Sequence, residues 1–221
     1  FNTADYGWMG EDMSVIKRDF LPTDLLPELK SIDFDGSVAV QARQSLEETN
    51  WLLQLADEHP HIKGVVGWLD LQSEQAEEQI AAFAKHPKAV GVRHVIHDEE
   101  DIDFMLRPAF IRGVQLLEKY HLAYDILIFP PHLANTIEFV KQFSEKQTFV
   151  VDHIAKPLIK DGIVSPWKED IAALAKFPNV YCKVSGMVTG ADWNTWKPEN
   201  IQPYLDIVFE AFGPERILIG S

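Results

Sequence analysis

Short apolar runs alternate along this chain with longer amphipathic stretches. The runs are rich in valine and isoleucine and are too short for typical helices, which favours buried β-strands. Seven strands are expected, within 37–43, 64–71, 90–96, 124–130, 149–155, 180–186 and 217–221. An irregular N-terminal arm precedes the first of them.

The stretches between the runs place apolar residues at helical spacing. In the first stretch, Leu52, Leu55 and Ala56 share one face, and acidic residues occupy the other. Pro108 is compatible with a helix because proline is tolerated in a first turn. The pattern predicts six helices, within 46–59, 74–86, 104–121, 131–145, 166–178 and 201–213.

The alternation of strand and helix predicts an α/β protein, and the absence of a linker favours a single domain over 1–221. Two architectures have this order, the closed (β/α)8 TIM barrel and the open doubly wound sheet. The open sheet usually has a glycine-rich phosphate loop after its first strand, but "VQARQSLEE" contains no glycine. The TIM barrel is therefore favoured. Because a barrel has eight strands, we expect its first strand before Phe1 and its last helix after Ser221, so that the chain is trimmed at both ends.

Composition disfavours several classes of protein. The 221 residues have a formal net charge of −14 at pH 7, so nucleic acid is not an expected partner. No apolar run approaches the roughly 18 residues of a membrane span, so no membrane partner is expected either. The single cysteine, Cys182, excludes an intrachain disulfide and fits a cytoplasmic location. The oligomeric state stays open, a homo-oligomer included.

Polar side chains cluster near the carboxyl ends of the predicted strands, and these ends converge on one pocket in a TIM barrel. They are Gln41, Arg43, Trp68, Asp70, Arg93, His94, His97, Asp152, His153, Lys156, Lys183 and Ser185. This set suits the hydrolysis of an ester or amide. Cations or a metal would polarise the carbonyl, and a carboxylate or histidine would activate water.

Each of these residues also has a structural interpretation. Asp152 and His153 should point to opposite sides of a strand, so we expect His153 to face the pocket and Asp152 to bond the barrel wall or a loop. Buried Arg93 and Lys183 need partners, either a substrate group or a structural acid. Trp68 is either core packing or a platform beneath a sugar ring.

The remaining histidines and acidic runs are interpreted as structural or solvated. These are His59, His61, His86, His121, His132, Glu47–Glu48 and Glu99–Asp101. His153 is then one candidate metal ligand, whereas a typical site needs three or four ligands. The residues by themselves give weak support for a metal.

Five segments together resemble the amidohydrolase-superfamily lactonases. They are "GVVGWLDL", "VGVRHVI", "FVVDHIAKP", "VYCKVSGMVTGADW" and "FGPERILIGS". The family includes L-fuconolactonase-like and L-rhamnonolactonase-like enzymes and is related to the 2-pyrone-4,6-dicarboxylate lactonases. The resemblance extends from "DYGWMGEDM" to Ser221, and "DHIAKP" with "CKVSGMVT" is its most specific part.

The resemblance implies a (β/α)8 barrel that acts in carbohydrate metabolism. Its small-molecule substrate would be a lactone such as L-fucono- or L-rhamnono-lactone, opened to the hydroxy acid. It implies His153 as a pocket histidine near the carbonyl or a metal and Arg93 as the substrate-anchoring cation, with Lys183, Gln41, Trp68 and His94 lining the same pocket. We therefore expect His153 and Lys183 as catalytic residues, His153 also as a metal ligand, and Arg93, His94, Gln41, Trp68 and Asp152 as substrate-binding residues. Family members differ in their need for metal, so a divalent ion such as zinc and a metal-independent reaction both stay open.

The resemblance also implies two elements outside this sequence, a His-x-His before Phe1 and an Asp after Ser221. That Asp would deprotonate the water that attacks the ring carbonyl, while His153, Arg93 and Lys183 stabilise the oxyanion. Two other functions stay open. One is a metal-dependent decarboxylase or amide hydrolase of the same superfamily, and the other is a non-catalytic barrel that acts as a binding protein.

Overall fold

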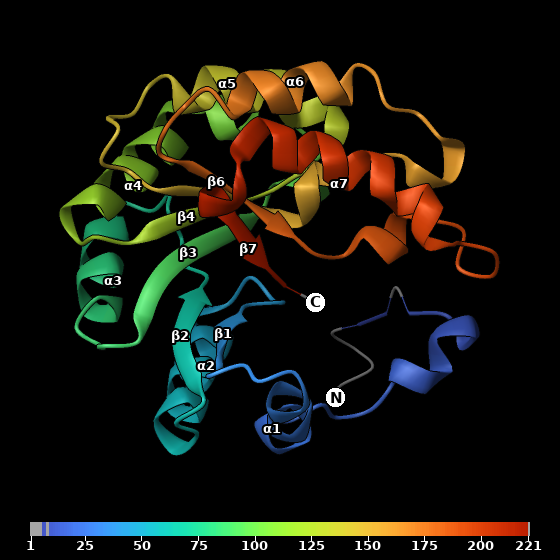
Figure 1. Ribbon diagram of the computed structural model, residues 1–221. Helices are drawn as coiled ribbons and strands as arrows, with labels where there is room; N and C mark the ends of the chain where they lie inside the picture. The colour runs from blue at the N-terminus through green and yellow to red at the C-terminus, as the bar shows by residue number, and fades with distance from the viewer. Residues whose placement is uncertain (1–5, 8, 221) are drawn as a thin grey trace.

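The computed structural model describes residues 6, 7 and 9–220 as a curled parallel sheet with helices along its outer side (Figure 1). Within these residues the sheet has seven strands in the order β1-β2-β3-β4-β5-β6-β7, and all neighbours are parallel. The strands are β1 Ser37–Val40, β2 Ile62–Gly67, β3 Ala89–Val95, β4 Ala123–Leu127, β5 Phe149–Val151, β6 Val180–Val184 and β7 Ile217–Ile219.

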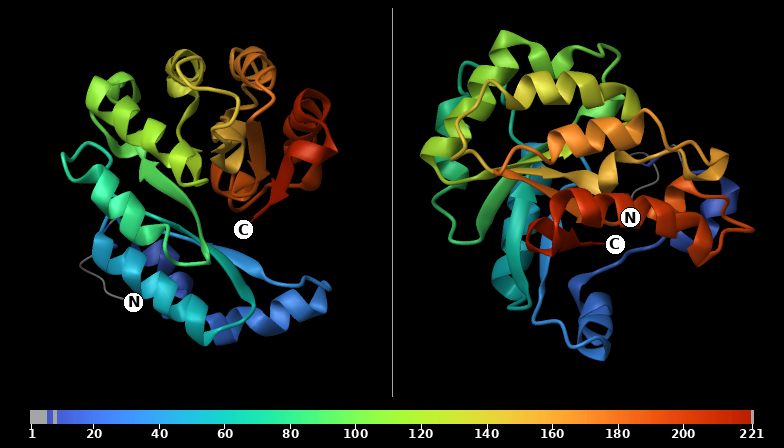
Figure 2. Two further views of the ribbon diagram at one scale, coloured as in Figure 1. Left: turned by 90° about the vertical axis from the view of Figure 1, so that its left-hand side faces the viewer. Right: turned by 45° about the horizontal axis from the view of Figure 1, so that its top comes forward.

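The strand order distinguishes the two architectures that the sequence allows. A doubly wound sheet reverses its order at a switch point, whereas barrel strands follow one another around the axis. The order here is sequential, and the sheet curls into a half-barrel with β1 and β7 at its two ends (Figure 2). The predicted TIM-barrel class is confirmed.

A helix follows each strand from β1 to β6, as expected for right-handed βαβ units. The helices are α1 Pro22–Ser31, α2 Leu46–Glu58, α3 Ala76–Phe83, α4 Pro108–Lys119, α5 Leu133–Val140, α6 Trp167–Leu174 and α7 Pro198–Phe212. Short 3-10 turns occupy Glu11–Ile16, Ile96–Asp98, Phe104–Leu106, Pro130–His132, Asp152–Ala155, Ile159–Asp161, Met187–Gly190 and Pro214–Arg216. In the described part of the chain, no helix has the length and apolar character that crossing a membrane requires.

Two expectations about the elements are wrong. The N-terminal arm is not irregular throughout, because α1 begins at Pro22 and the Leu21 N–H donates to Asp24 Oδ2 over 2.8 Å. The predicted strand 149–155 ends at Val151, because residues 152–155 form a tight turn. This second difference changes the direction of the side chains at the site.

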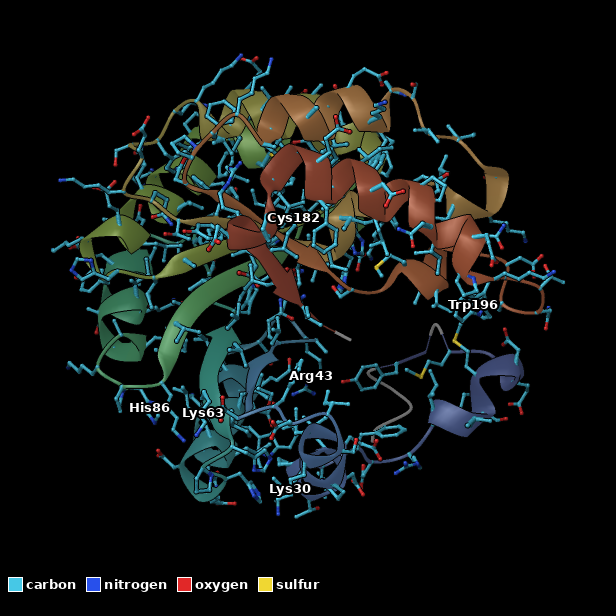
Figure 3. All side chains as sticks on the ribbon, in the orientation of Figure 1. Lys30, Arg43, Lys63, His86, Cys182 and Trp196 are labelled. Carbon is cyan, nitrogen blue, oxygen red and sulfur yellow. The ribbon has the colours of Figure 1, made fainter. Side chains whose placement is uncertain are left out.

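The core lies between the outer face of the sheet and the helices. Phe110, Tyr124, Phe139 and Phe149 form an aromatic cluster there, with ring centroids 5.8–6.4 Å apart. Cys182 belongs to the same layer (Figure 3), and burial raises the pKa of its thiol to about 12. A thiol that stays protonated is a poor nucleophile, so Cys182 has a packing role.

Candidate functional site

Four charged side chains meet on the inner side of the half-barrel. Arg93 comes from β3, Asp125 from β4, Asp152 from the first position after β5, and Lys183 from β6. Alternation along a strand explains their direction, since Tyr124 belongs to the outer aromatic cluster and Asp125 must face the other way. Four adjacent strands therefore contribute one charged group each.

These four side chains form a continuous ion-paired network. Arg93 Nη1 lies 2.7 Å from Asp152 Oδ2, and Lys183 Nζ lies 2.5 Å from Asp152 Oδ1. Lys183 Nζ also lies 2.9 Å from Asp125 Oδ2. Gln41, which follows β1, extends the network through two hydrogen bonds with Arg93. The Arg93 guanidinium donates to the Gln41 backbone carbonyl, and Gln41 Nε2 donates to the Arg93 backbone carbonyl over 3.2 Å.

The two carboxylates of the network differ in acidity. Burial raises the pKa of Asp125 to about 6, and the neighbouring Asp152 adds to this. Burial opposes ionisation of Asp152 as well, but Lys183 and Arg93 outweigh it and hold the pKa of Asp152 below its usual value. Burial works against the charge of Lys183, yet the two carboxylates raise its pKa. Asp152 is thus the stable counterion at the centre.

The expected direction of Asp152 needs correction. Asp152 was expected to bond the barrel wall or a loop, but its carboxylate is fully buried among the inward cations. His153 was expected to face the pocket, and its side chain lines a small pocket. It does so from the turn after β5, where alternation no longer applies, and its Nδ1 lies 2.7 Å from Ser185 Oγ. Both residues thus point towards polar partners.

The turn that carries His153 has an unusual backbone. His153, Ile154, Ala155 and Lys156 have φ values of 52°, 49°, 56° and 48°, all in the left-handed region. Such a conformation is rare for a β-branched residue such as Ile154. Its carbonyl accepts a hydrogen bond of 2.8 Å from Trp167 Nε1, which anchors the turn to α6.

His153 is uncharged at neutral pH. Burial, together with the nearby cations, lowers the pKa of His153 to about 4, although Asp152 works in the opposite direction. A small pocket beside the ring is lined by His153, Lys156, Gly186, Met187 and Thr189. Nδ1 is engaged by Ser185, and within the described chain no hydrogen bond engages Nε2. A neutral imidazole at a pocket can donate or accept one proton there.

Trp68 and His94 do not join the charged network. His94 alternates with Arg93 along β3 and stacks on Phe104, with ring centroids 4.8 Å apart. Its Nδ1 accepts from Trp68 Nε1 over 3.2 Å, and its Nε2 lies 2.6 Å from Glu99 Oε1. The expectation that these two residues line one pocket with Arg93 is therefore not met by the geometry.

Comparison with known proteins identifies the family. Residues 7–221 match the amidohydrolase family description Amidohydro_2, which is nearly the whole chain. The chain belongs to the amidohydrolase family. The resemblance inferred from the sequence motifs is thereby confirmed.

Two curated relatives of this amidohydrolase are each named L-fucono-1,5-lactonase. The protein from Burkholderia multivorans (strain ATCC 17616 / 249) is 36% identical over 231 residues, covering 100% of this chain and 77% of the relative. The protein from Burkholderia ambifaria is 34% identical over 221 residues, covering 99% of this chain and 75% of the relative.

Solved structures agree with the half-barrel. A crystal structure of an amidohydrolase from Burkholderia multivorans with bound zinc superposes with a TM-score of 0.94 at 36% identity, covering 100% of this chain and 80% of that one. A probable 2-pyrone-4,6-dicarboxylic acid hydrolase from Acinetobacter baumannii has a TM-score of 0.73 at 18% identity, with the same coverage. The second similarity shows the fold alone.

The described residues of this amidohydrolase do not make a metal site by themselves. Among them, no group of three histidine, cysteine, aspartate or glutamate side chains could hold an ion. Asp152 and Asp125 are engaged by cations, which leaves His153 as a single donor. The sequence His59-Pro60-His61 precedes β2 and lies at the amino end of that strand, away from the carboxyl ends.

Two residues at this site were missed or misassigned by sequence analysis. Asp125 is 2% exposed and pairs with Lys183, but its neighbours in "YDILIFP" give only a strand pattern. Glu48 was interpreted as a solvated residue, yet it is 6% exposed and accepts hydrogen bonds from the Ala42 and Arg43 N–H groups. The one signal that could have identified Asp125 is that it is a single acidic residue within an apolar strand, where a buried charge needs a partner.

Proposed function

We propose that this amidohydrolase opens a sugar-acid lactone of the L-fucono-1,5-lactone class by attack of water on the ring carbonyl. The observation that carries the proposal is the likeness to two L-fucono-1,5-lactonases at 34–36% identity over at least 99% of this chain. The chemistry of the site supports it, since a neutral lactone needs electrophilic assistance at its carbonyl oxygen.

His153 would supply that assistance. When the Ser185 hydroxyl donates to Nδ1, the proton of the neutral imidazole lies on Nε2, which can donate to the carbonyl oxygen. Lys183 would add a second donor, because an ammonium has three N–H bonds and the two carboxylates engage two of them. Arg93 and Asp152 would hold the ends of β3, β5 and β6 in place.

A divalent metal such as zinc would polarise the same oxygen, with His153 as a ligand. This chain's described residues supply no second ligand beside His153. The fit between the donors and a metal is therefore poor within the described part.

The test compares wild-type enzyme and variants on a panel of aldonolactones, with aromatic and 2-oxo acids included for a decarboxylase. We expect opening of L-fucono-1,5-lactone, and a loss in kcat/KM of at least about 100-fold in His153→Ala, as for a positioned catalytic group. His86→Ala is the matched control, because His86 pairs with Asp57 outside the site. Absence of lactone opening by the wild type would refute the function, and wild-type turnover by His153→Ala would refute the role of that residue.

A further inference from the structure

Lys156 lies at the site, but the lactone hydrolysis proposed above gives it no role. It ends the turn after β5, and its ammonium lies 2.9 Å from His97 Nε2. The same nitrogen lies 4.9 Å from the centroid of the Phe129 ring. His97 follows β3 and Phe129 follows β4, so three adjacent strand ends surround this one cation.

A short relay fixes the ammonium. His97 Nδ1 lies 2.7 Å from Asp98 Oδ1, and a carboxylate there requires the ring proton on Nδ1. Nε2 is then the acceptor for Lys156. Burial first, and Lys156 second, lower the pKa of His97, which agrees with a neutral ring. The His97 ring also packs against Phe129 at 4.6 Å between centroids, which limits its rotation.

The backbone at Lys156 is held in a conformation that costs free energy. Lys156 is the last of four consecutive left-handed residues, and His153 is the first. Strain of this kind persists only where the surroundings impose it, and it clusters at functional sites. Its effect here is to bring Lys156 and His153 to the same pocket, which Gly186 and Thr189 also line.

The charge of Lys156 is balanced differently from that of the other inner cations. Arg93 and Lys183 are each ion-paired with a buried carboxylate. Lys156 has a neutral imidazole as its hydrogen-bond acceptor, and no carboxylate of the described chain lies within salt-bridge distance. Burial lowers the pKa of Lys156, and Asp98 and Asp152 oppose this only from beyond salt-bridge distance. A half-buried cation with no carboxylate in contact favours an anionic group that arrives from outside.

We propose that Lys156 is a further catalytic residue, which binds the lactone oxygen at C1 as that oxygen becomes negatively charged, and then the carboxylate of the product. This role rests on the proposed lactone hydrolysis. Water adds to C1 and gives up one proton to a base, which leaves a tetrahedral oxyanion, and the bond from C1 to the ring oxygen then breaks. The ring oxygen takes up the proton held by the base, and the carboxylic acid that forms releases its own proton to solvent and becomes a carboxylate.

Lys156 should bind the neutral lactone and the anionic species of the reaction with different strength. The lactone is neutral and gains little from an ammonium in the ground state, whereas the oxyanion and the carboxylate gain much more. In Lys156→Met we expect kcat to fall about 100-fold with KM changed less than about threefold. Inhibition by L-fuconate should weaken at least about 10-fold, because a charged hydrogen bond is lost. Lys160→Met, in the exposed part of the same loop, is the matched control.

Two further variants test the relay. His97→Leu removes the hydrogen-bond acceptor of Lys156 and should lower kcat and L-fuconate inhibition as Lys156→Met does. His97→Gln keeps an acceptor and should recover part of the kcat. Lys156→Arg keeps the charge and should retain most of the L-fuconate binding. Wild-type kcat and L-fuconate inhibition in Lys156→Met would overturn the proposal, as would an equal loss for His97→Leu and His97→Gln.

Calorimetric titration with L-fuconate and with the neutral alditol L-fucitol decides the anion binding independently of turnover. We expect Lys156→Met to lose affinity for L-fuconate while its affinity for L-fucitol stays unchanged. An equal loss for both ligands would overturn the proposal. If the wild type opens no lactone, the proposed function fails, and this titration still decides whether Lys156 binds the carboxylate. If Lys156→Met does not fold, the same comparison with His97→Leu decides.

Discussion

Asp125 shows how a single buried residue can influence the electrostatics of the site. Its carboxylate shares Lys183 with Asp152, and its pKa rises from an ordinary 3.8 to about 6 because of burial and of Asp152. Asp152 has the opposite response in the same network, because two cations bond to it. The two aspartates differ in pKa because they lie at different positions relative to the cations.

This difference predicts a pH-dependent stability effect of Asp125→Asn. Between pH 3.8 and about 6 the folded protein retains a proton that the unfolded chain has lost, so its free energy of unfolding falls as the pH rises through that window. Asparagine resembles the protonated acid and cannot titrate. Thermal melts of wild type and variant should therefore show the variant gaining in relative stability from pH 4 to pH 6. A difference in Tm that stays constant over this range would contradict the raised pKa.

At the scale of the elements, the turn after β5 and the residue after Ser185 form one unit. Gly186 has a φ of +66°, and a Cβ atom there would lie 2.9 Å from His153 Nδ1. The position therefore needs glycine for its backbone and also for the close approach of the imidazole. The end of β6 thereby fixes the orientation of a residue that follows β5.

Gly186→Ala should consequently impair catalysis as well as stability. The left-handed backbone costs about 1–2 kcal/mol for alanine, and displacement of His153 should lower kcat/KM by about 10-fold or more. Gly162→Ala is the matched control, since Gly162 has a φ of +65° and no atom within 4 Å of its Cβ position. Chemical denaturation should show a stability loss for both variants, at least as large for Gly186→Ala, and steady-state kinetics should show a loss for Gly186→Ala alone. Equal kinetics in the two variants would refute the contact with His153.

At the scale of the whole molecule, the aromatic layer and the charged network lie on opposite faces of the same sheet. Tyr124 faces the helices, and Asp125 beside it faces the inside of the half-barrel. The core can therefore be altered with little direct effect on the site, because the sheet backbone separates them. That residues 1–221 form a single domain stays a prediction.

Phe139→Ala tests this separation. Phe139 is fully buried and contacts the rings of Phe110, Tyr124, Phe143 and Phe149. Its removal should lower the free energy of unfolding by about 3–5 kcal/mol, while kcat of the folded fraction changes little. Phe209→Ala, at a residue that is 45% exposed, should change stability by less than about 0.5 kcal/mol. A large fall in kcat for folded Phe139→Ala would show that the two faces are coupled.

The sequence by itself determined the succession of strands and helices, the barrel class and the family. Alternating periods of two and 3.6 residues are local, and they report which face of each element is buried. The motifs "DHIAKP" and "CKVSGMVT" are also continuous in the chain. These patterns can be recognised without knowing which strands are neighbours in the sheet.

Only the tertiary structure decided which charged groups meet. Arg93 and Asp152 are 59 residues apart, Lys183 and Asp125 are 58 apart, and Lys156 and His97 are 59 apart. These contacts depend on the register of parallel strands, which no local pattern contains. The turn at 152–156 likewise lies outside strand periodicity, so alternation could not place Asp152, His153 and Lys156. The site forms because parallel pairing of the strands and the left-handed turn after β5 bring together residues that are far apart in the sequence.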